Sequence, residues 1–525
     1  MNTATMDSYL RWRVTLAQPA IELDLADADL DNADPALWKD LERALEAMHE
    51  LESGAIANPD EGRRVGHYWL RNPELAPEPM IRTAIESMWS QIDDIAARVL
   101  AGTLCAGDGT PFVEVLLVGI GGSALGPQLL ADALGVAKPQ GLPLRVLDNT
   151  DPAGIARTLA ALDSLAHTLV LVVSKSGATV ETRNGMLEII AACERAELSF
   201  ARQAIAITGE GSKLAAKAMT ESWLAIVPMW DWVGGRTSVL AAVGLLPAAL
   251  LGLDWRTLLG GAAAMDHRTR APARDNPAAL LALLWHHQGQ GRGAKAMVAL
   301  PYRDALILLS RYLQQLVMES LGKRLNRQGT EVWQGLSVFG NKGSTDQHAY
   351  VQQLRDGLDN FFALFVRVLD DGTPSALEVE PGVTSGDCLD GFYQGTRAAL
   401  RERGRASATL VLDRLDASSI GATIALFERA VGLYAELIDV NAYHQPGVEA
   451  GKVAAKAVLD RQHRLLAAVL SKRSGCTAAE IAQETGDPAL EAWQILRRLA
   501  ANRRILQEGD DPASATFRAV GAAES

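Results

Sequence analysis

Three hydroxyl side chains surround one turn of this 525-residue chain, in the segment SKSGATVET that begins at Ser174. Ser174, Ser176 and Thr179 follow the apolar run HTLVLVVS, have Lys175 beside them, and precede a helical pattern. A single Ser or Thr at such a turn would need no explanation beyond capping the helix N-terminus. Three hydroxyls beside the amides of a helix start are typical of a site that holds phosphate without a metal. We therefore predict that this turn binds a phosphate group.

A glycine-rich turn follows an earlier apolar run. VEVLLVGI leads directly into GIGGSALGP, where Gly122 and Ser123 stand at the predicted strand-to-helix turn. Glycine lets the backbone come close to a ligand, and the next helix offers N–H groups to an anion. The spacing is not the G-x-G-x-x-G dinucleotide fingerprint, and a tight turn without a ligand explains this segment equally well. Both turns, however, come at the carboxyl ends of strands, where open α/β sheets bind ligands.

A long helical pattern, RDALILLSRYLQQLVMESLGKRL, carries a carboxylate among apolar residues. Gln315 and Glu319 are four residues apart and share a face of the predicted helix. A carboxylate in such a dry setting suits a general base that works near neutral pH. The alternative is an ordinary surface glutamate paired with Lys323 one turn later, and spacing alone favours that alternative.

Three further polar residues follow loops or turns. His348 comes after the loop GNKGSTD, Arg236 after the Gly-Gly turn of WDWVGGRTS, and Lys452 after the Pro-Gly turn of HQPGVEAGK. A guanidinium beside glycines can stabilise an anionic oxygen, and histidine and lysine can exchange protons. A solvated arginine and an ordinary helix start are the alternatives. No His, Cys or carboxylate set has metal-site spacing such as HExxH, so we expect no metal and no cofactor.

The elements that position these residues fall into successive blocks. Between residues 101 and 255, short apolar runs alternate with helical patterns, which predicts a doubly wound parallel sheet. A second such block, with strands AKAMVALPY, NFFALFVRVL and SATLVLDRL, covers residues 256–455. Residues 1–100 are charged and helical in pattern, and residues 456–525 form a C-terminal extension. The expected fold class is α/β, with two doubly wound parallel sheets, a helical N-terminal region and a small winged-helix-like extension.

The extension predicts two short helices joined by a Gly-Asp turn, followed by a hairpin. A DNA-reading helix of this kind makes its contacts near its N-terminal half. Here that half carries Asp487 and Glu491, whereas Arg497 and Arg498 come late. A small packing or interaction module is the better interpretation of this pattern.

Composition excludes several other classes of protein. The chain is 48% hydrophobic and 22% charged, it has no window approaching the ~20 apolar residues of a membrane helix, and it has no secretory signal pattern. A net charge of −13 argues against general nucleic-acid binding but permits an anionic small molecule at a local site. The four cysteines are far apart and without CxxC spacing, so we expect reduced thiols and a cytoplasmic protein.

Taken together, these segments resemble the glucose-6-phosphate isomerase family over roughly residues 55–460. The matching stretches, in the family's order, are GIGGSALGP, SKSGATVET, WVGGRTSVLAAVG, QQLVMESLGK, STDQHAYVQQL and QPGVEAGK. NPDEGRRVGHYWLR, at residues 58–71, resembles the family's N-terminal segment. The resemblance implies two sugar-isomerase domains and a metal-free interconversion of glucose 6-phosphate and fructose 6-phosphate through an enediolate, in glycolysis and gluconeogenesis.

The resemblance also implies which residues hold the substrate. Those that would surround the phosphate are Gly122, Ser123, Ser174, Lys175, Ser176 and Thr179. Those that would hold sugar hydroxyls or phosphate are Gln315 and Gln445.

Four residues would carry the chemistry if the resemblance holds. Glu319 would move the proton between C1 and C2, and Arg236 would stabilise the enediolate. His348 and Lys452 would open the sugar ring. In the family the histidine reaches the site from the partner subunit, so a homodimer is implied.

The chain departs from many relatives at two points. Ser176, Gly177 and Ala178 stand where aromatic and threonine residues are common, and QQLVMES lacks a Gly-Asp pair before the glutamate. Neither change removes a charged catalytic group. Two alternatives stay open: an isomerase that also accepts mannose 6-phosphate, and a sugar-phosphate-sensing regulator that uses the winged-helix-like tail.

Overall fold

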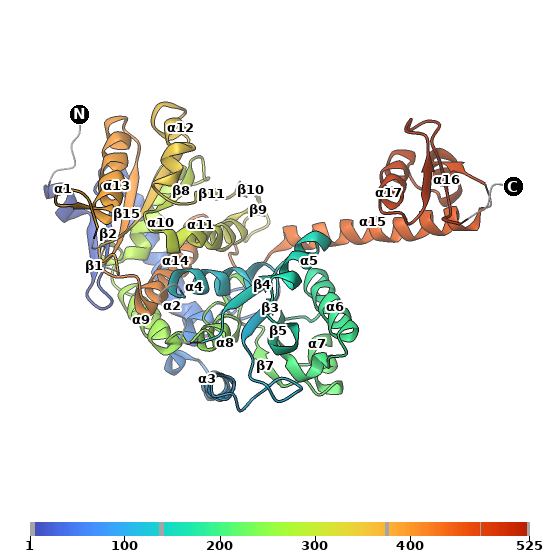
Figure 1. Cartoon of the computed structure of the whole chain (residues 1–525). Coiled ribbons are helices and arrows are strands. Elements are labelled where there is room, and N and C mark those ends of the chain that lie inside the picture. Colours follow the sequence, from blue (N-terminus) through green and yellow to red (C-terminus); the bar gives the residue numbers. More distant parts are fainter. Residues whose placement is uncertain (1–5, 136–140, 373–376, 473, 522–525) are drawn as a thin grey trace. The chain divides into compact units, whose positions relative to one another are not determined.

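Five parallel strands form the sheet from which both predicted ligand-binding turns emerge (Figure 1). The computed structural model describes residues 6–135, 141–372, 377–472 and 474–521. In spatial order the strands are β4 (Leu144–Leu147), β3 (Glu114–Val118), β5 (Thr168–Ser174), β6 (Ala204–Gly209) and β7 (Ala225–Met229). The chain leaves β3 for β4 on one side and returns to β5 on the other. This reversal makes the carboxyl ends of β3 and β5 a topological switch point, where doubly wound sheets bind ligands.

Both faces of this sheet are buried, as its continuous apolar runs predict. Leu117 and Leu171 face the central core of the protein, whereas Leu116 and Val170 face a second core. That second core is covered by three helices, α5 (Pro152–Ala160), α6 (Val180–Arg195) and α7 (Lys213–Thr220). The predicted doubly wound parallel sheet is confirmed.

A six-stranded sheet forms the second α/β block. Its order is β1 (Arg13–Leu16), β2 (Ile21–Asp24), β15 (Ser407–Leu412), β12 (Phe361–Val368), β8 (Ala296–Pro301) and β11 (Val338–Phe339). The last four strands are parallel and include the three strands expected from the sequence.

The N-terminal hairpin of this sheet was not expected, because the first hundred residues have a helical pattern. Strands β1 and β2 pair antiparallel, and β2 also pairs antiparallel with β15, with Ile21 opposite Leu412. The hairpin covers the otherwise open edge of β15 and buries Val14, Ile21 and Leu23. The segment is therefore a strand pair because it is buried against the edge of β15, and the local sequence pattern does not show that contact.

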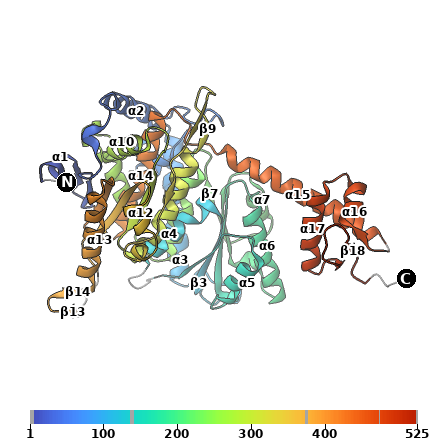
Figure 2. The same cartoon turned by 90° about the horizontal axis from the view of Figure 1, so that it is seen from above.

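Helices packed around the two sheets contribute the rest of the central core (Figure 2). They are α2 (Ala36–Glu52), α3 (Pro79–Leu100), α4 (Leu125–Leu134), α8 (Ala242–Leu250), α9 (Trp255–Arg268), α10 (Pro277–Gly289), α11 (Ile307–Leu313) and α14 (Ala417–Leu437). Elsewhere in the same unit lie α1 (Met6–Arg11), α12 (Val351–Asp356), α13 (Ser385–Glu402), the pair β9 (Lys323–Leu325) and β10 (Glu331–Gln334), and the pair β13 (Glu378–Glu380) and β14 (Val383–Thr384).

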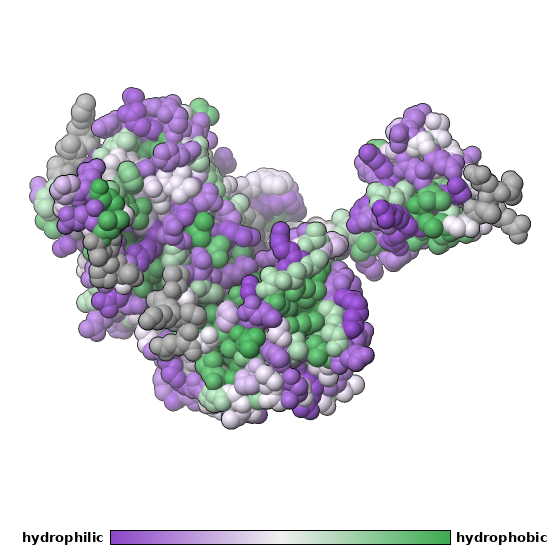
Figure 3. All heavy atoms as spheres, viewed as in Figure 1, coloured by the Kyte–Doolittle hydropathy of each residue, from purple (hydrophilic) through white to green (hydrophobic). Residues whose placement is uncertain are grey.

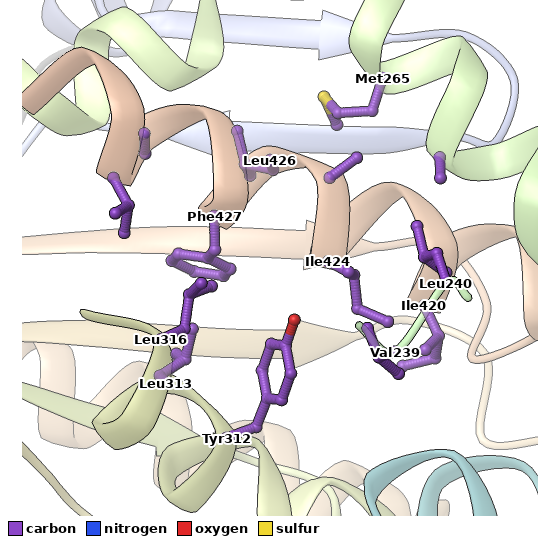
Figure 4. Packing of buried hydrophobic residues seen from close by; sticks show 14 of the residues in the cluster. Val239, Leu240, Met265, Tyr312, Leu313, Leu316, Ile420, Ile424, Leu426 and Phe427 are labelled. Atoms are coloured by element: carbon purple, nitrogen blue, oxygen red, sulfur yellow. The ribbon is translucent and has the colours of Figure 1, made fainter. Parts of the chain in front are cut away.

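The long helix predicted around Glu319 is interrupted in its second half. Helix α11 continues as a π-helix over Gln314–Glu319, and β9 begins at Lys323. Figure 4 shows Tyr312, Leu313 and Leu316 of this segment packing toward Ile424 and Phe427 of α14. Short π-helical turns inside helices are frequent at functional sites.

The chain separates into two compact units, Met1–His444 and Gln445–Ser525. The second contains α15 (Pro446–Ser471), β16 (Cys476–Thr477), α16 (Ala478–Thr485), α17 (Ala489–Ala501), β17 (Leu506–Glu508) and β18 (Thr516–Arg518). Its antiparallel sheet has the order β16-β18-β17 around a core that includes Trp493 and Phe517. This order of helices and strands is that of a winged helix, in agreement with the expectation for the extension.

The visible face of the molecule carries mostly hydrophilic residues, and hydrophobic residues gather in separate patches rather than in one band (Figure 3). Among the described helices, none combines the length and the apolar character needed to span a bilayer. The four cysteines are all free thiols.

Two neighbouring glycines of α9 allow a matched test of how closely α9 packs on α14. A Cβ on Gly261 would lie 1.9 Å from the carbonyl oxygen of Ser418, whereas a Cβ on Gly260 would meet nothing within 4 Å. We expect Gly261→Ala to lower the free energy of unfolding by about 1–3 kcal/mol, because α9 must move off the neighbouring backbone. Gly260→Ala should raise it by up to about 1 kcal/mol, through higher helix propensity. Urea titration measures both, and equal effects would contradict the close packing.

Candidate active site

The predicted phosphate turn, at the carboxyl end of β5, is held by hydrogen bonds between its own residues. The Ser174 hydroxyl donates to the Thr179 hydroxyl at 3.2 Å, and the Ser176 hydroxyl accepts from the Ala178 N–H at 3.2 Å. Thr179 stands at the N-cap position of α6, but its side chain makes no capping hydrogen bond. Capping, the ordinary explanation for a hydroxyl here, therefore does not account for these residues. The turn and the first amides of α6 together offer donors suited to an anion.

The ammonium group of Lys175 is directed at a neighbouring loop. Its Nζ donates to the carbonyl oxygens of Val233 at 3.0 Å and Asp231 at 3.4 Å. Burial lowers the pKa of Lys175, and the nearby charge of Arg63 adds to that effect. This side chain thus ties the phosphate turn to the loop that leads to Arg236. Its part in binding phosphate stays a prediction.

The glycine-rich turn after β3 rests directly on the same loop. A Cβ on Gly122 would lie 2.0 Å from the carbonyl oxygen of Gly235 and 2.9 Å from the amide nitrogen of Arg236. The Ser238 hydroxyl donates to the Gly235 carbonyl at 2.7 Å and reaches the Gly122 carbonyl at 3.4 Å. Ser123 follows in the short 3-10 helix Gly121–Ser123, half-buried. Only glycine fits at position 122, because the backbone of residue 235 occupies the space of a side chain.

Arg236 is almost fully buried, with 7% of its surface exposed. Its Nη1 donates to the Ala442 carbonyl at 2.6 Å and to the Ser320 hydroxyl at 3.3 Å. Its Nη2 donates to the His444 carbonyl at 3.3 Å, and its Nε lies 3.3 Å from Oε2 of Glu319. Burial lowers the pKa of Arg236, and the Glu319 carboxylate opposes that effect. Arginine keeps its proton under these conditions, so the group is a fixed positive charge.

Glu319 ends the π-helix and points its carboxylate at this charge. Its side chain is 18% exposed, and Oε2 is buried without a hydrogen-bond partner among the described residues. The contact with Arg236 is therefore an ion pair in which Oε2 accepts no hydrogen bond. Gln315, four residues earlier, places its Nε2 3.0 Å from the position of a Cβ on Gly121. The structure thus brings Glu319, Gln315, Arg236 and the glycine-rich turn together.

Glu319 does not form the side-chain ion pair with Lys323 that spacing alone favoured. Lys323 is buried, and its Nζ donates to the backbone carbonyls of Glu319 and Ser320, each at 2.7 Å. Burial lowers the pKa of Lys323 to about 7, and the charge of Arg236 acts in the same direction. The sequence suggested Lys323 only as a surface partner of Glu319, not as a buried lysine. No pattern in the sequence indicated that the carbonyls of Ala442 and His444 bind Arg236.

Three predicted residues lie elsewhere in the chain. His348 ends the 3-10 helix Thr345–His348 and is exposed. Gln445 and Lys452 belong to the second unit, at and just after the start of α15. Their parts in a site stay predictions.

Comparison with known proteins gives a consistent result. The model of a family described as phosphoglucose isomerase matches residues 35–371 and 398–478. The chain is 56% identical over 485 residues to a glucose-6-phosphate isomerase of Citrifermentans bemidjiense, covering 91% of each chain. It is 56% identical over 476 residues to one of Thermosynechococcus vestitus, covering 90% of each. A crystal structure of a glucose-6-phosphate isomerase from Chlamydia trachomatis superposes with a TM-score of 0.78 at 25% identity, over 88% of this chain and 92% of that one.

Burial of Lys323 predicts a pH-dependent contribution to stability. Its pKa is about 7 in the folded chain and ~10.4 when unfolded, so the unfolded state binds more protons between these values. Stability should therefore rise with pH across this window, by at most about 1.4 kcal/mol per pH unit. We expect Lys323→Met to remove this rise when unfolding free energies are measured by urea titration from pH 7 to 10. Lys213→Met, at the exposed start of α7, should follow the wild-type curve; a Lys323→Met curve parallel to wild type would contradict the assignment.

Proposed function

The chain belongs to the phosphoglucose isomerase family, and we propose that its activity, the interconversion of glucose 6-phosphate and fructose 6-phosphate, is carried by Glu319 and Arg236. The observation that supports this assignment most directly is the 3.3 Å ion pair between the two side chains. The pair lies beside the glycine-rich turn at the switch point of the first sheet. It places a proton acceptor and a fixed positive charge side by side.

The proton transfer needs a base that can take a proton from carbon and return it to the neighbouring carbon. Glu319 removes the proton from C2 of the open-chain aldose, and the electrons move onto the carbonyl oxygen at C1 to give an enediolate. The same carboxyl then returns the proton to C1 while the proton of the C2 hydroxyl passes to the C1 oxygen, so that the C2 oxygen becomes the ketose carbonyl. Arg236 stabilises the negative charge of the enediolate, because it is held in position before the charge develops.

The phosphate group anchors the substrate away from the reacting carbons. In this proposal the hydroxyls of Ser174, Ser176 and Thr179 hold it, with backbone groups of the turn containing Gly122 and Ser123. The Thr179 hydroxyl does not cap α6, and this supports a role in phosphate binding. Binding at the phosphate orients the sugar and contributes to rate without touching the reacting bonds. Gln315 and Gln445 then hold sugar hydroxyls or phosphate.

Ring opening precedes the proton transfer, because the substrate is mostly a closed ring. We assign this step to His348 and Lys452 as acid and base. The exposed position of His348 supports its delivery across an interface to the site of a second subunit. The proposal is therefore a homodimer with shared sites, which works in the cytoplasm and uses no metal or cofactor.

Replacing Glu319 tests the base directly. Glu319→Gln keeps the size and polarity of the side chain but removes the proton acceptor, so kcat should fall by about 10³-fold or more, while substrate binding stays close to wild type. A coupled assay with glucose 6-phosphate, run with and without EDTA, gives kcat, and calorimetry gives binding. Glu331→Gln on the exposed strand β10 is the matched control. Turnover near the wild-type value in Glu319→Gln would refute the assignment.

Mixing two inactive variants tests the shared site. Glu319→Gln and His348→Ala are each expected to be inactive, but a mixed dimer has one site with both native residues. Refolding equal amounts together should restore about a quarter of wild-type activity, because half of the dimers are mixed and each has one working site. Each variant refolded alone is the control. Mixed dimers, verified by mass spectrometry, that show no activity would contradict a site shared between subunits.

A further inference from the structure

Two buried polar side chains line a cavity that Arg236 also lines. His67 is 2% exposed, and neither of its ring nitrogens has a hydrogen-bond partner among the residues that the structure describes. Glu428 is 3% exposed; its Oε2 pairs with Nη1 of Arg71 at 2.5 Å, whereas its Oε1 has no partner in the described part of the chain. Both side chains line a cavity of about 50 Å³, and Arg236 and Ser320 line the same cavity.

The two side chains that carry these unpartnered atoms come from different elements of the fold. His67 begins the 3-10 helix His67–Arg71 in the segment HYWLR, and Glu428 lies in α14. Arg71 holds Asp266 through two hydrogen bonds, at 2.7 and 3.0 Å, so the Glu428–Arg71 pair belongs to a rigid ionic cluster. Glu428 therefore cannot turn away from the cavity to find another partner without breaking this cluster.

Leaving buried polar atoms without partners is unfavourable. Each unsatisfied donor or acceptor costs about 1–3 kcal/mol, and the two lining residues His67 and Glu428 carry three such atoms. A cavity needs roughly 10–15 Å³ of this kind of space to hold a water with two or more polar partners. The cavity is large enough, and its walls supply the partners.

We propose that this cavity binds ordered water, and that His67 and Glu428 hold this water against Arg236 as positioning residues for the isomerase reaction. The part concerning Arg236 rests on the function proposed above. The water solvates the guanidinium beside its contacts to Ser320 and to the carbonyls of residues 442 and 444.

The consequence concerns the distance between Arg236 and Glu319. A buried cation that loses its water gains more from a nearby carboxylate, because the interaction strengthens as the surroundings become less polar. Drying the cavity should therefore draw Arg236 closer to Glu319 than 3.3 Å and into a hydrogen bond. A carboxylate so engaged is a weaker base, and the guanidinium is less available to the enediolate.

Variants of His67 distinguish the effect of losing the bound water from the effect of changing the packing. His67→Phe fills the space without polar atoms and should lower kcat about tenfold through misplacement of Arg236, with KM within about twofold of wild type. His67→Gln retains hydrogen-bonding groups and should keep most of the activity. Val431→Ala, which enlarges the same cavity without removing a polar group, is the control and should leave kcat unchanged.

A crystal structure provides a readout that does not depend on activity. In the wild type, water density should lie within hydrogen-bond distance of a His67 ring nitrogen and of Glu428 Oε1, and in His67→Phe this water should be missing. A dry cavity in the wild type would overturn the proposal even if Glu319→Gln behaves as expected. Equal losses of kcat in His67→Phe and His67→Gln at unchanged melting temperature would also overturn it. If His67→Phe does not fold, His67→Leu replaces it, and the wild-type density still decides whether water is bound.

Discussion

The contact between Arg236 and Glu319 is the interaction on which the rest of the site depends. Its two side chains come from segments about eighty residues apart, and each is held by groups from still other segments. The guanidinium is fixed by backbone oxygens of residues 442 and 444 and by the hydroxyl of Ser320. The loop that carries it is held by Lys175 from one side and by the Gly122 turn from the other. A fixed charge of this kind stabilises a developing anion because nothing needs to reorganise during the reaction.

A buried guanidinium is unfavourable unless its hydrogen-bonding groups are satisfied. Here two of the partners are backbone carbonyls, which carry no formal charge and cannot be lost by side-chain rotation. Lys323 acts in a similar way on the other side, since it binds the carbonyls at the end of the π-helix rather than the carboxylate of Glu319. Arg236 and Lys323 thus both bind backbone carbonyls, and Oε2 of Glu319 accepts no hydrogen bond from any residue that the structure describes.

Much of this arrangement could be predicted from sequence, because it depends on local pattern. The apolar runs around Leu117 and Leu171 identified a parallel sheet, and the hydroxyls of Ser174 and Thr179 identified the turn at its edge. Other features could not be predicted. Residues 13–24 form a strand pair although the surrounding region is helical in pattern, because an open sheet edge next to β15 is available only in the folded chain. The π-helix over Gln314–Glu319 has no distinct periodicity in so short a segment.

By itself, the sequence determined the family of the chain, the strands and turns of the first sheet, and the types of residue that could hold a phosphate and move a proton. It left two interpretations of Glu319, a general base and a surface glutamate paired with Lys323, and spacing favoured the second. The tertiary structure excluded the pairing with Lys323, since it placed Lys323 on backbone oxygens and Arg236 against the carboxylate. It also placed His67 and Glu428 at the same cavity as Arg236, although His67 and Glu428 are separated by most of the chain. The physical reason is that spacing along a helix reports only neighbours within a turn or two, whereas burial and charge pairing depend on segments that meet only when the sheets and helices pack.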